Sequence, residues 1–406
     1  MGGKASLLLV IAFNIIFMIA GRHFNEMATR TTINSVDYFT DAKLHTLTSS
    51  GINLVANRLF LKSTQNDTTY NFSLDGGTIT AVLTTLNQAQ RIRQLVATGT
   101  YGSQTSSVKI VVKPSSFSKF AYFSDSEGGN IWWTSRDTVW GPFHTNDNLR
   151  IANNPVFYGK VTVGGTQIKY NNQANAQYLG GYQEGVNIPI TTNGVSDAQT
   201  VAAAGGANTT NQTLVYFEFR GDSIRYRYSA NGAWTYRLAS AYAPNGVISF
   251  QNAEVHVKGT VKGQYTLAVS GPSNQNRGNI HIDDDLVYYS NPKTNPNSTD
   301  MLGLAAQQNI IITNNAANNN NVVIQASMYA ERGSFTAENY NYRPVSGFID
   351  LYGGITQYSR GPVGQFQGNN IVNGFSKRYR YDDRFMIQSP PAFPGTGKFE
   401  IVSWFE

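Results

Sequence analysis

The sequence begins with a nearly continuous apolar run, KASLLLVIAFNIIFMIAG, at residues 4–21. From Ala5 to Gly21 only Ser6 and Asn14 resist burial in lipid; Lys4 precedes this stretch and Arg22 follows it directly. A membrane-spanning helix needs about 20 apolar residues, whereas the apolar part of a secretory signal has about 7 to 15 and ends at a small-residue cleavage site. Because the residues before Arg22 make a poor site of that kind, we expect the run to remain as a membrane helix.

The following residues predict that this helix continues. Residues 22–50 contain neither Gly nor Pro, and the first proline of the chain is Pro114. The residues that recur at steps of about three and four, as on one helical face, are Met27, Val36, Thr40, Leu44, Leu47, Leu54 and Leu59. We therefore expect one helix over residues 4–60, on the order of 80 Å long, apolar all round at its start and amphipathic toward its end.

A small sheet is expected after the helix. The four segments with strand character are TYNFSL (69–74), TITAVLTTL (78–86), RIRQLVATGTY (91–101) and SVKIVVKP (107–114). Alternating apolar residues, such as Ile79, Ala81 and Leu83, give this sheet one apolar face, which the amphipathic half of the helix can cover. The segment RIRQL can alternatively extend a helix from Gln88.

Beyond Pro114 the sequence changes to short strands separated by Gly, Asn and Pro turns, without helical periodicity to its end. Such spacing fits a sandwich, a barrel or a solenoid. Asn-rich turns, as in ITNNAANNNNVVI (312–324), favour an irregular β-solenoid with stacked amide side chains. Residues 213–240 predict a pair of hairpins inserted between its rungs.

The predicted fold class is therefore α+β, with a long N-terminal hydrophobic helix, a small antiparallel sheet and a large all-β distal domain. The predicted regions are a helix at 1–62, a sheet at 63–114 and a β-rich surface domain at 115–406, which includes a hairpin insertion near 205–243 and a C-terminal tail at 376–406.

Composition narrows the classes of function. The chain contains no Cys, which excludes disulfides and thiol redox chemistry. Its net charge of +6 is spread without any block of five basic residues, so nucleic acid is not an expected partner. Only 14% of residues are charged, which is low for a soluble domain and typical of an extended surface protein.

Three groups of polar residues are candidates for chemistry. His144 lies close to Asp147, and an imidazole beside a carboxylate can begin an acid/base pair, but a structural hydrogen bond at a tight turn is favoured. His256 and His281 fall on separate strands, where they can bind zinc, yet no third ligand has a suitable spacing. The acidic run 283–285 can hold Ca²⁺, but it lacks the glycine-spaced pattern of calcium loops. A turn that prevents pairing at a sheet edge is the favoured interpretation.

We therefore expect no catalytic residue, no bound metal and no cofactor. A glycan-cleaving β-solenoid enzyme needs acids or bases clustered along one groove, and the 25 acidic residues are scattered. The aromatic residues that can stack on a sugar, or else belong to the core, are Trp132, Trp133, Trp140 and Trp234.

The order of an apolar helix, an amphipathic helix and a small sheet resembles type IV pilins. DYFTDAKLHTLTSSGINLVANRLF (37–60) is similar to the segment after the membrane helix in minor pilins. Pilin precursors have a glycine before their cleavage point and usually a glutamate five residues into the mature chain. The resemblance implies cleavage after Gly2 or Gly3, but the first acidic residue of this chain is Glu26, so the usual glutamate is missing.

The distal region resembles an uncharacterised family of bacterial surface proteins that have pilin-like starts. The segments that carry this resemblance are VWGPFHTNDNLRI (139–151), PVFYGKVT (155–162) and YDDRFMIQSPPAFPGTGKFEIVSWFE (381–406). The resemblance implies a secreted protein that is tethered to a membrane or carried on a filament. No reaction is attached to that family.

Together, the resemblances imply a subunit of an extracellular type IV pilus-like filament, inserted in the inner membrane before assembly. Its expected partners are copies of itself, the pilus assembly machinery, the membrane and a glycan or other surface ligand. A membrane-anchored or tip-located adhesin is the alternative, and a glycan-acting enzyme is less favoured. The residues expected in the membrane helix and filament core are Leu7, Leu8, Leu9, Ile11, Phe13, Asn14, Ile15, Ile16, Phe17 and Ile19.

Overall fold

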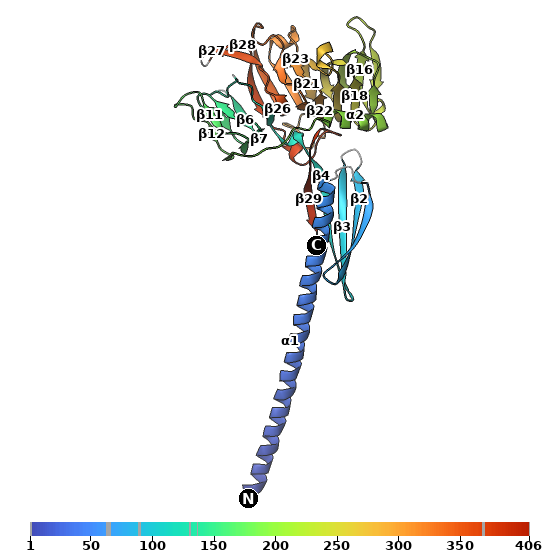
Figure 1. Ribbon diagram of the computed structural model, residues 1–406, viewed down its shortest axis with the longest axis vertical. Helices are drawn as coiled ribbons and strands as arrows, with labels where there is room; N and C mark the ends of the chain where they lie inside the picture. Colours follow the sequence, from blue (N-terminus) through green and yellow to red (C-terminus); the bar gives the residue numbers. More distant parts are fainter. Residues whose placement is uncertain are drawn as a thin grey trace. The chain divides into compact units, whose positions relative to one another are not determined.

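The computed structural model describes residues 2–61, 66–87, 91–129, 131–135, 137–367 and 370–405. The fold is of the α+β class, with one long N-terminal helix followed by a mostly β region (Figure 1). The chain divides into two compact units: Met1–Asn87 with Ile92–Lys113 and Phe399–Glu406, and Gln88–Arg91 with Pro114–Lys398.

The first unit contains the helix and a five-stranded sheet. Its elements are α1 (Gly2–Leu61), β1 (Thr68–Leu74), β2 (Gly77–Asn87), β3 (Ile92–Tyr101), β4 (Gln104–Ser116) and β29 (Gly395–Phe405). Strands β1 to β4 pair antiparallel in sequence order, and β29 lies beside β4. The single helix and the four strands predicted from the sequence are confirmed.

Two details of this unit differ from the prediction. The fifth strand, β29, comes from the segment interpreted as a distal tail, and no local pattern could indicate that it pairs with a strand almost 300 residues earlier. The alternative helix from Gln88 is wrong from Ile92 onward, where β3 begins. Gln88 itself, and the predicted boundary between residues 62 and 63, lie outside the described residues.

Helix α1 covers the apolar face of the sheet with its C-terminal half. Leu47, Ile52, Val55 and Leu59 form one buried cluster with alternating residues of β2, β3 and β4. The predicted helical face was partly wrong, because Leu54 is 42% exposed and points away from the sheet. Each residue of an α-helix is turned by about 100° from the last, so an error of one position removes a side chain from the contact.

A glycine allows α1 to approach the sheet closely. A Cβ at Gly51 would lie 2.6 Å from Cγ2 of Ile79 on β2, closer than real Cβ atoms approach other atoms. We expect Gly51→Val to lower the local free energy of unfolding by about 1–3 kcal/mol, because the larger side chain forces helix and sheet apart. Hydrogen exchange of β2 and β3 amides in the detergent-solubilised chain measures this.

The matched control is Gly21→Val, because nothing lies within 4 Å of a Cβ at Gly21. This variant should leave the exchange of the same amides unchanged. Equal protection in the wild type and the Gly51→Val variant would contradict the close-contact explanation.

The second unit is built mainly from three parallel ladders of short strands. The first ladder runs, in spatial order, through β14 (Ala207–Thr209), β18 (Val247–Gln251), β20 (Gln264–Ser270), β22 (Met301–Ala306), β24 (Val322–Ala330), β26 (Val345–Ser359), β5 (Tyr122–Ser126), β7 (Phe143–Thr145), β10 (Val161–Val163) and β13 (Tyr182–Gln183). The second comprises β15 (Leu214–Gly221), β19 (Glu254–Val261), β21 (Ile280–Tyr288), β23 (Ile310–Ile312) and β25 (Phe335–Ala337). The third extends from β26 through β28 (Asn370–Arg380), β6 (Thr138–Trp140), β9 (Val156–Phe157) and β12 (Gln177–Tyr178).

Further elements complete this unit. They are the parallel pair β8 (Leu149–Ile151) and β11 (Gln167–Lys169), the strands β16 (Ser223–Arg227), β17 (Thr235–Leu238) and β27 (Gly364–Gln367), and the helices α2 (Gly194–Gly205) and α3 (Ala239–Tyr242). The short 3₁₀ helices are Phe117–Lys119, Ser273–Gln275, Ala317–Asn319 and Asp383–Met386. The predicted hairpins are confirmed in β15–β16 and β16–β17, although β15 also pairs in parallel with β19.

The core of the second unit consists of apolar side chains stacked from strand to strand. In the second ladder, Val255, Ile280, Ile310 and Phe335 occupy the same register and are all buried. In-register pairing brings the β-branched and aromatic side chains of neighbouring strands into contact, which stabilises the sheet.

The expectation of an all-β distal region is wrong at α2. This helix buries Val195, Ala198 and Ala202, which follow the three- and four-residue steps of one helical face. They contact Val247, Ala268 and other buried residues of the first ladder. The run VAAA favours a helix, but its short apolar side chains give a weak periodic signal.

Candidate functional site

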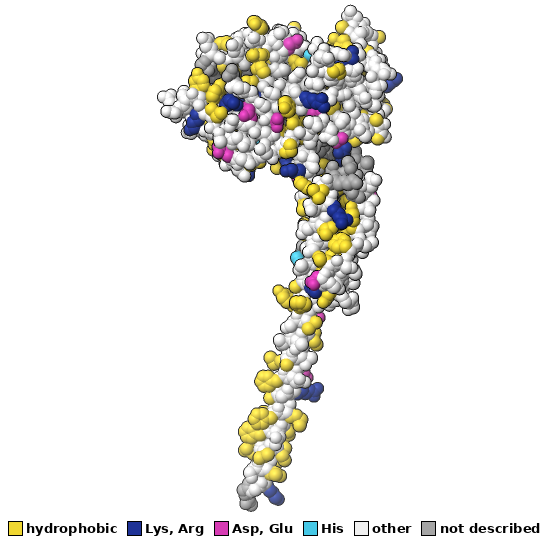
Figure 2. All heavy atoms as spheres, viewed as in Figure 1, with side chains coloured by type: hydrophobic (Ala, Val, Ile, Leu, Met, Phe, Trp, Pro, Cys, Tyr) yellow, Lys and Arg dark blue, Asp and Glu magenta, His cyan; other side chains and the backbone are white. Residues whose placement is uncertain are grey.

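The main surface feature of the first unit is the N-terminal half of α1, where the described apolar side chains are largely exposed. Leu8 is 67% exposed and Phe17 is 70% exposed. Figure 2 shows hydrophobic side chains covering this part of the helix. By length and composition, the helix Gly3–Leu61 can cross a membrane, and none of its most apolar window is buried. The ten residues named from the sequence all lie on this part of α1.

Asn14 is the one amide side chain within this apolar segment. Its Nδ2 atom donates to the carbonyl oxygen of Val10 at 2.9 Å. The helix backbone therefore satisfies part of its polar group, which lowers the cost of placing it in an apolar environment.

His144 does not form the acid/base pair considered from the sequence. The side chain lies buried on β7 against Phe123, and its ring nitrogens bond to Thr162 at 2.7 Å and to Asn146 at 2.8 Å. Asp147 instead accepts from the backbone N–H groups of Glu127 and Asn148. The predicted structural hydrogen bond fits this geometry, but the predicted tight turn does not, because His144 lies on β7 and Thr162 on the paired strand β10.

The tautomer of His144 follows from its partners. The amide nitrogen of Asn146 donates to Asp125 and to the carbonyl of Ile188, so its oxygen is left to accept from His144 Nε2. His144 Nδ1 then accepts from the Thr162 hydroxyl. Burial lowers the pKa of His144 below 6.5, so the neutral ring is the folded form.

This burial predicts an acid-sensitive fold. Just below pH 6.5, His144 becomes protonated in the unfolded chain but stays neutral in the folded chain. The free energy of unfolding therefore falls as the pH drops toward the pKa of the folded state. The loss is about 1.4 kcal/mol for each pH unit between the two pKa values. Denaturation between pH 5 and 7.5 should show a shallower pH slope for His144→Gln than for the wild type. His23→Gln, at a side chain that is 72% exposed, is the control, and equal slopes for His144→Gln and wild type would refute the assignment.

A cavity of about 730 Å³ lies in the second unit. Partly exposed aromatic residues line it, namely Trp132, Tyr170, Tyr340 and Phe366. Trp132 meets Tyr170 edge to face, with ring centroids 5.2 Å apart. Arg360 and Lys377 also line the cavity, so it combines aromatic surfaces with hydrogen-bond donors. Such a lining suits a ligand with apolar faces and polar edges.

The donors of this cavity belong to a buried ionic network. Glu127 Oε2 accepts from Arg360 Nη1 at 2.8 Å and from Trp133 Nε1 at 2.9 Å. Its other oxygen accepts from Tyr122 and Ser124 at 2.8 and 2.6 Å. The network satisfies the charge of a fully buried carboxylate.

Nearby, Lys377 donates to Asp137 at 3.0 Å, and burial lowers the pKa of Lys377. Sequence reasoning missed both ion pairs because their members are more than 200 residues apart.

The four tryptophans named from the sequence serve different roles. Trp133 is buried in the core, Trp140 stacks on Tyr158 at 5.5 Å, and the guanidinium groups of Arg225 and Arg227 lie 4.3 and 4.5 Å from the ring centroid of Trp234. Trp132 is the one among them that is both partly exposed and part of the cavity lining.

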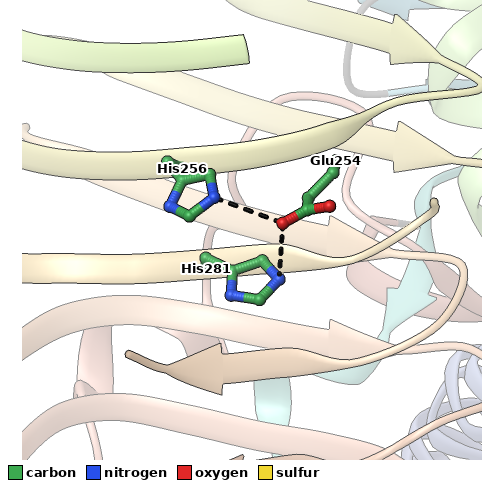
Figure 3. Close-up of side chains that lie close together, drawn as sticks. All are labelled: Glu254, His256 and His281. Carbon is green, nitrogen blue, oxygen red and sulfur yellow. Dashed lines mark hydrogen bonds and ion pairs between the residues drawn. The ribbon is translucent and has the colours of Figure 1, made fainter. Parts of the chain in front are cut away.

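His256 and His281 occupy matching positions on the neighbouring strands β19 and β21. Their rings are stacked, with centroids 4.7 Å apart and planes 17° apart. Glu254 lies two residues before His256, on the same face of β19, and its Oε1 atom is 3.3 Å from His256 Nε2 and 3.4 Å from His281 Nε2 (Figure 3). One ligand atom from each of the three side chains falls within 4.8 Å of the other two.

Glu254 is a potential third ligand that the search for a suitable spacing in the sequence did not identify. The spacing Glu-x-His already indicated that Glu254 lies beside His256, since residues two apart point to the same face of a strand. What the sequence could not reveal is that His281 pairs with His256 rather than with another residue of β19.

The acidic run 283–285 does not gather into one site. The three residues form a bulge, because Val257 pairs with Ile282 while Gly259 pairs with Leu286. Asp283 accepts from His256 Nδ1 at 2.8 Å, whereas the Asp285 carboxylate accepts from the backbone of Val323 at 2.7 Å.

The described residues of this run thus divide between different partners. Asp283 helps to raise the pKa of His256 against the opposing effect of burial, and the hydrogen bond from His256 helps to lower the pKa of Asp283.

Comparisons with known proteins give few relatives. Residues 69–166 match a family described as a domain of unknown function, DUF4900. No curated protein matches the chain. Among solved structures, the competence-associated pilin ComZ from Thermus thermophilus aligns at 15% identity over 84% of this chain and 86% of its own, with a TM-score of 0.32. A TM-score of that size does not establish a shared fold.

Proposed function

We propose that this chain is a structural subunit of an extracellular, type IV pilus-like filament. The N-terminal half of α1 holds it first in the inner membrane and then, after assembly, among the same helices of neighbouring copies. In this proposal the ten apolar-segment residues form the filament core, and cleavage of a precursor falls after Gly2 or Gly3. The protein performs no catalysis in this role.

The observation that supports this proposal is the division of α1 into two halves. The C-terminal half is covered by the sheet, whereas the apolar N-terminal half is exposed to solvent. Burying a large apolar side chain contributes about 1.5–3 kcal/mol, so the nine apolar residues among the ten provide ample free energy for insertion and assembly. A soluble domain has no use for an uncovered apolar helix of this length.

We further propose that the second unit is a β-solenoid that the filament presents to its surroundings; it corresponds to the predicted region 115–406 without residues 399–406, which belong to the first unit. The parallel ladders support this proposal, as do asparagines that bridge successive strands. Asn309 donates from its backbone to the Asn279 side chain at 2.9 Å, and Asn318 donates to the carbonyl of Ile282 at 2.8 Å. Side-chain amides that replace backbone partners at corners are a feature of stacked rungs.

A membrane-anchored or tip-located adhesin is the second candidate function. The cavity favours it, because partly exposed aromatic rings beside charged donors suit contact with a glycan on another surface. The two candidates differ in abundance, since a filament subunit must greatly exceed a tip component.

The test is electron microscopy of filaments sheared from the native cell surface, with mass spectrometry of their main component and its N-terminus. A helical filament composed mainly of this chain is the expected result. A chain that is rare in the filaments, or that stays with the membrane fraction, would reject the filament role and favour the anchored adhesin.

A further inference from the structure

Asp283 determines which ring nitrogen of His256 carries the proton. The Asp283 Oδ1 atom accepts from the Thr313 hydroxyl at 2.6 Å and lies 2.8 Å from His256 Nδ1. A carboxylate oxygen has only lone pairs to offer, so the proton of this contact belongs to His256 Nδ1. In a neutral imidazole, the other nitrogen, Nε2, then carries a lone pair.

That lone pair faces a carboxylate. Glu254 Oε1 lies 3.3 Å from His256 Nε2, and its lone pairs repel the lone pair of the neutral ring. The same oxygen lies 3.4 Å from His281 Nε2. Two ring nitrogens and one carboxylate oxygen therefore converge on a small volume that requires a positive charge, either a proton or a cation.

We propose that Glu254, His256 and His281 bind a divalent transition-metal ion, with Zn²⁺ as the best match. Imidazole nitrogen and carboxylate oxygen are zinc ligands, whereas Ca²⁺ and Mg²⁺ prefer oxygen alone. At zinc bond lengths of about 2.0–2.1 Å, the ligand atoms of a tetrahedral site lie about 3.4 Å apart. The two contacts of Glu254 Oε1, at 3.3 and 3.4 Å, already have this separation.

The contact between Asp283 and His256 is the kind that orients a metal ligand. Metal-binding histidines usually donate their second N–H to a carboxylate or carbonyl, which fixes the tautomer and aims the other nitrogen at the ion. Asp283 on β21 provides this support, and Thr313, which directly follows β23, donates to it. Asp283 is a positioning residue in this proposal and does not contact the ion.

Metal binding requires one ring to turn. The two rings are stacked with their planes 17° apart, so their nitrogen lone pairs run side by side instead of meeting at one point. His256 is held by Asp283 and by stacking on Tyr216 at 4.7 Å, whereas His281 Nδ1 has no hydrogen-bond partner among the described residues. Rotation of His281 about χ2, a torsion with a broad minimum, breaks no hydrogen bond of that nitrogen.

The site leaves a coordination position for another ligand. All three side chains are partly exposed, with 14% of His256, 13% of His281 and 27% of Glu254 accessible. A fourth ligand can therefore be water or a group from another molecule. The proposal stands independently of filament assembly, because all its residues lie on β19, β21 and the adjoining loop of the second unit.

Calorimetric titration of the full-length, detergent-solubilised and chelator-treated chain with Zn²⁺ tests the proposal. The expected result is one high-affinity site per chain. Glu254→Gln and His281→Ala should each weaken binding at least tenfold, and Asp283→Asn should weaken it by about 10–100-fold, as loss of an orienting contact does. His23→Gln and His45→Gln are the matched controls, since the chain has five histidines, and both should bind as the wild type does.

Co²⁺ substitution provides a second readout, since tetrahedral Co²⁺ absorbs strongly in the visible range and octahedral Co²⁺ weakly. Absence of Zn²⁺ binding at micromolar concentrations, or binding that Glu254→Gln and His281→Ala leave unchanged, would overturn the proposal. Circular dichroism of each variant reports whether it folds. If His281→Ala unfolds the ladder, then Glu254→Gln decides alone, because it preserves the shape of the side chain.

Discussion

Replacing Ile15 with Asp is expected to abolish filament assembly while the second unit remains folded. Ile15 lies in the uncovered half of α1 and is 52% exposed. A carboxylate at the centre of a membrane helix costs about 2.5–3.5 kcal/mol on insertion scales, and it also has no partner inside a bundle of apolar helices. Electron microscopy of sheared surface material measures filament assembly, and immunoblotting of the membrane fraction measures membrane insertion. Leu9→Asp should behave in the same way.

The control for this experiment is Ile15→Leu, which preserves apolar volume and should assemble normally. Circular dichroism and hydrogen exchange of the second unit show whether the Asp variant keeps its distal fold. Wild-type numbers of normal filaments from the Ile15→Asp variant would reject the assignment of this segment as the filament core.

Arg360→Met is expected to lower the free energy of unfolding of the second unit by about 3–5 kcal/mol. The Arg360 side chain is 4% exposed, and its guanidinium group donates to Glu127, which is fully buried. Removing the cation leaves a buried carboxylate with neutral hydrogen-bond donors but without its charged partner. Denaturation followed by tryptophan fluorescence is suited to this measurement, because Trp133 bonds to Glu127 and its ring lies 4.1 Å from the Arg360 guanidinium.

An exposed ion pair of the same unit provides the comparison. Lys262 lies 2.8 Å from Asp222, and both side chains are well exposed. Lys262→Met should change stability far less than Arg360→Met, because water screens an exposed ion pair. Adding Glu127→Leu to Arg360→Met should recover part of the loss, since it removes the unpaired charge. Equal changes in the free energy of unfolding for Arg360→Met and Lys262→Met would show that the buried ion pair contributes no more to stability than the exposed one.

The sequence predicted those elements whose signals are local. Helix α1 follows from a long stretch without Gly or Pro, and β2 from the alternation of Ile79, Ala81 and Leu83. The exact buried face of α1 was harder to predict. Leu54 and Val55 are both apolar, and only the position of the sheet decides which of them is covered.

The parts that sequence reasoning missed depend on contacts between distant segments. Arg360 and Glu127 are separated by 233 residues, and no spacing rule connects them. The Glu254 and His256 pair was readable from its two-residue spacing, but the third ligand, His281, depends on the register between β19 and β21. Helix α2 was missed because alanines contribute little apolar surface to a periodic pattern.

The placement of β29 has a consequence for the order in which the protein matures. Residues 114–398 of the second unit interrupt the chain of the first unit, whose sheet is completed only by the last strand. During synthesis, the second unit therefore emerges entirely before the first can close. Until then β4 presents an unpaired edge, which neighbouring chains can join. A truncation that ends before residue 399 would keep that edge open permanently, so such a fragment should aggregate even though every residue of the second unit is present.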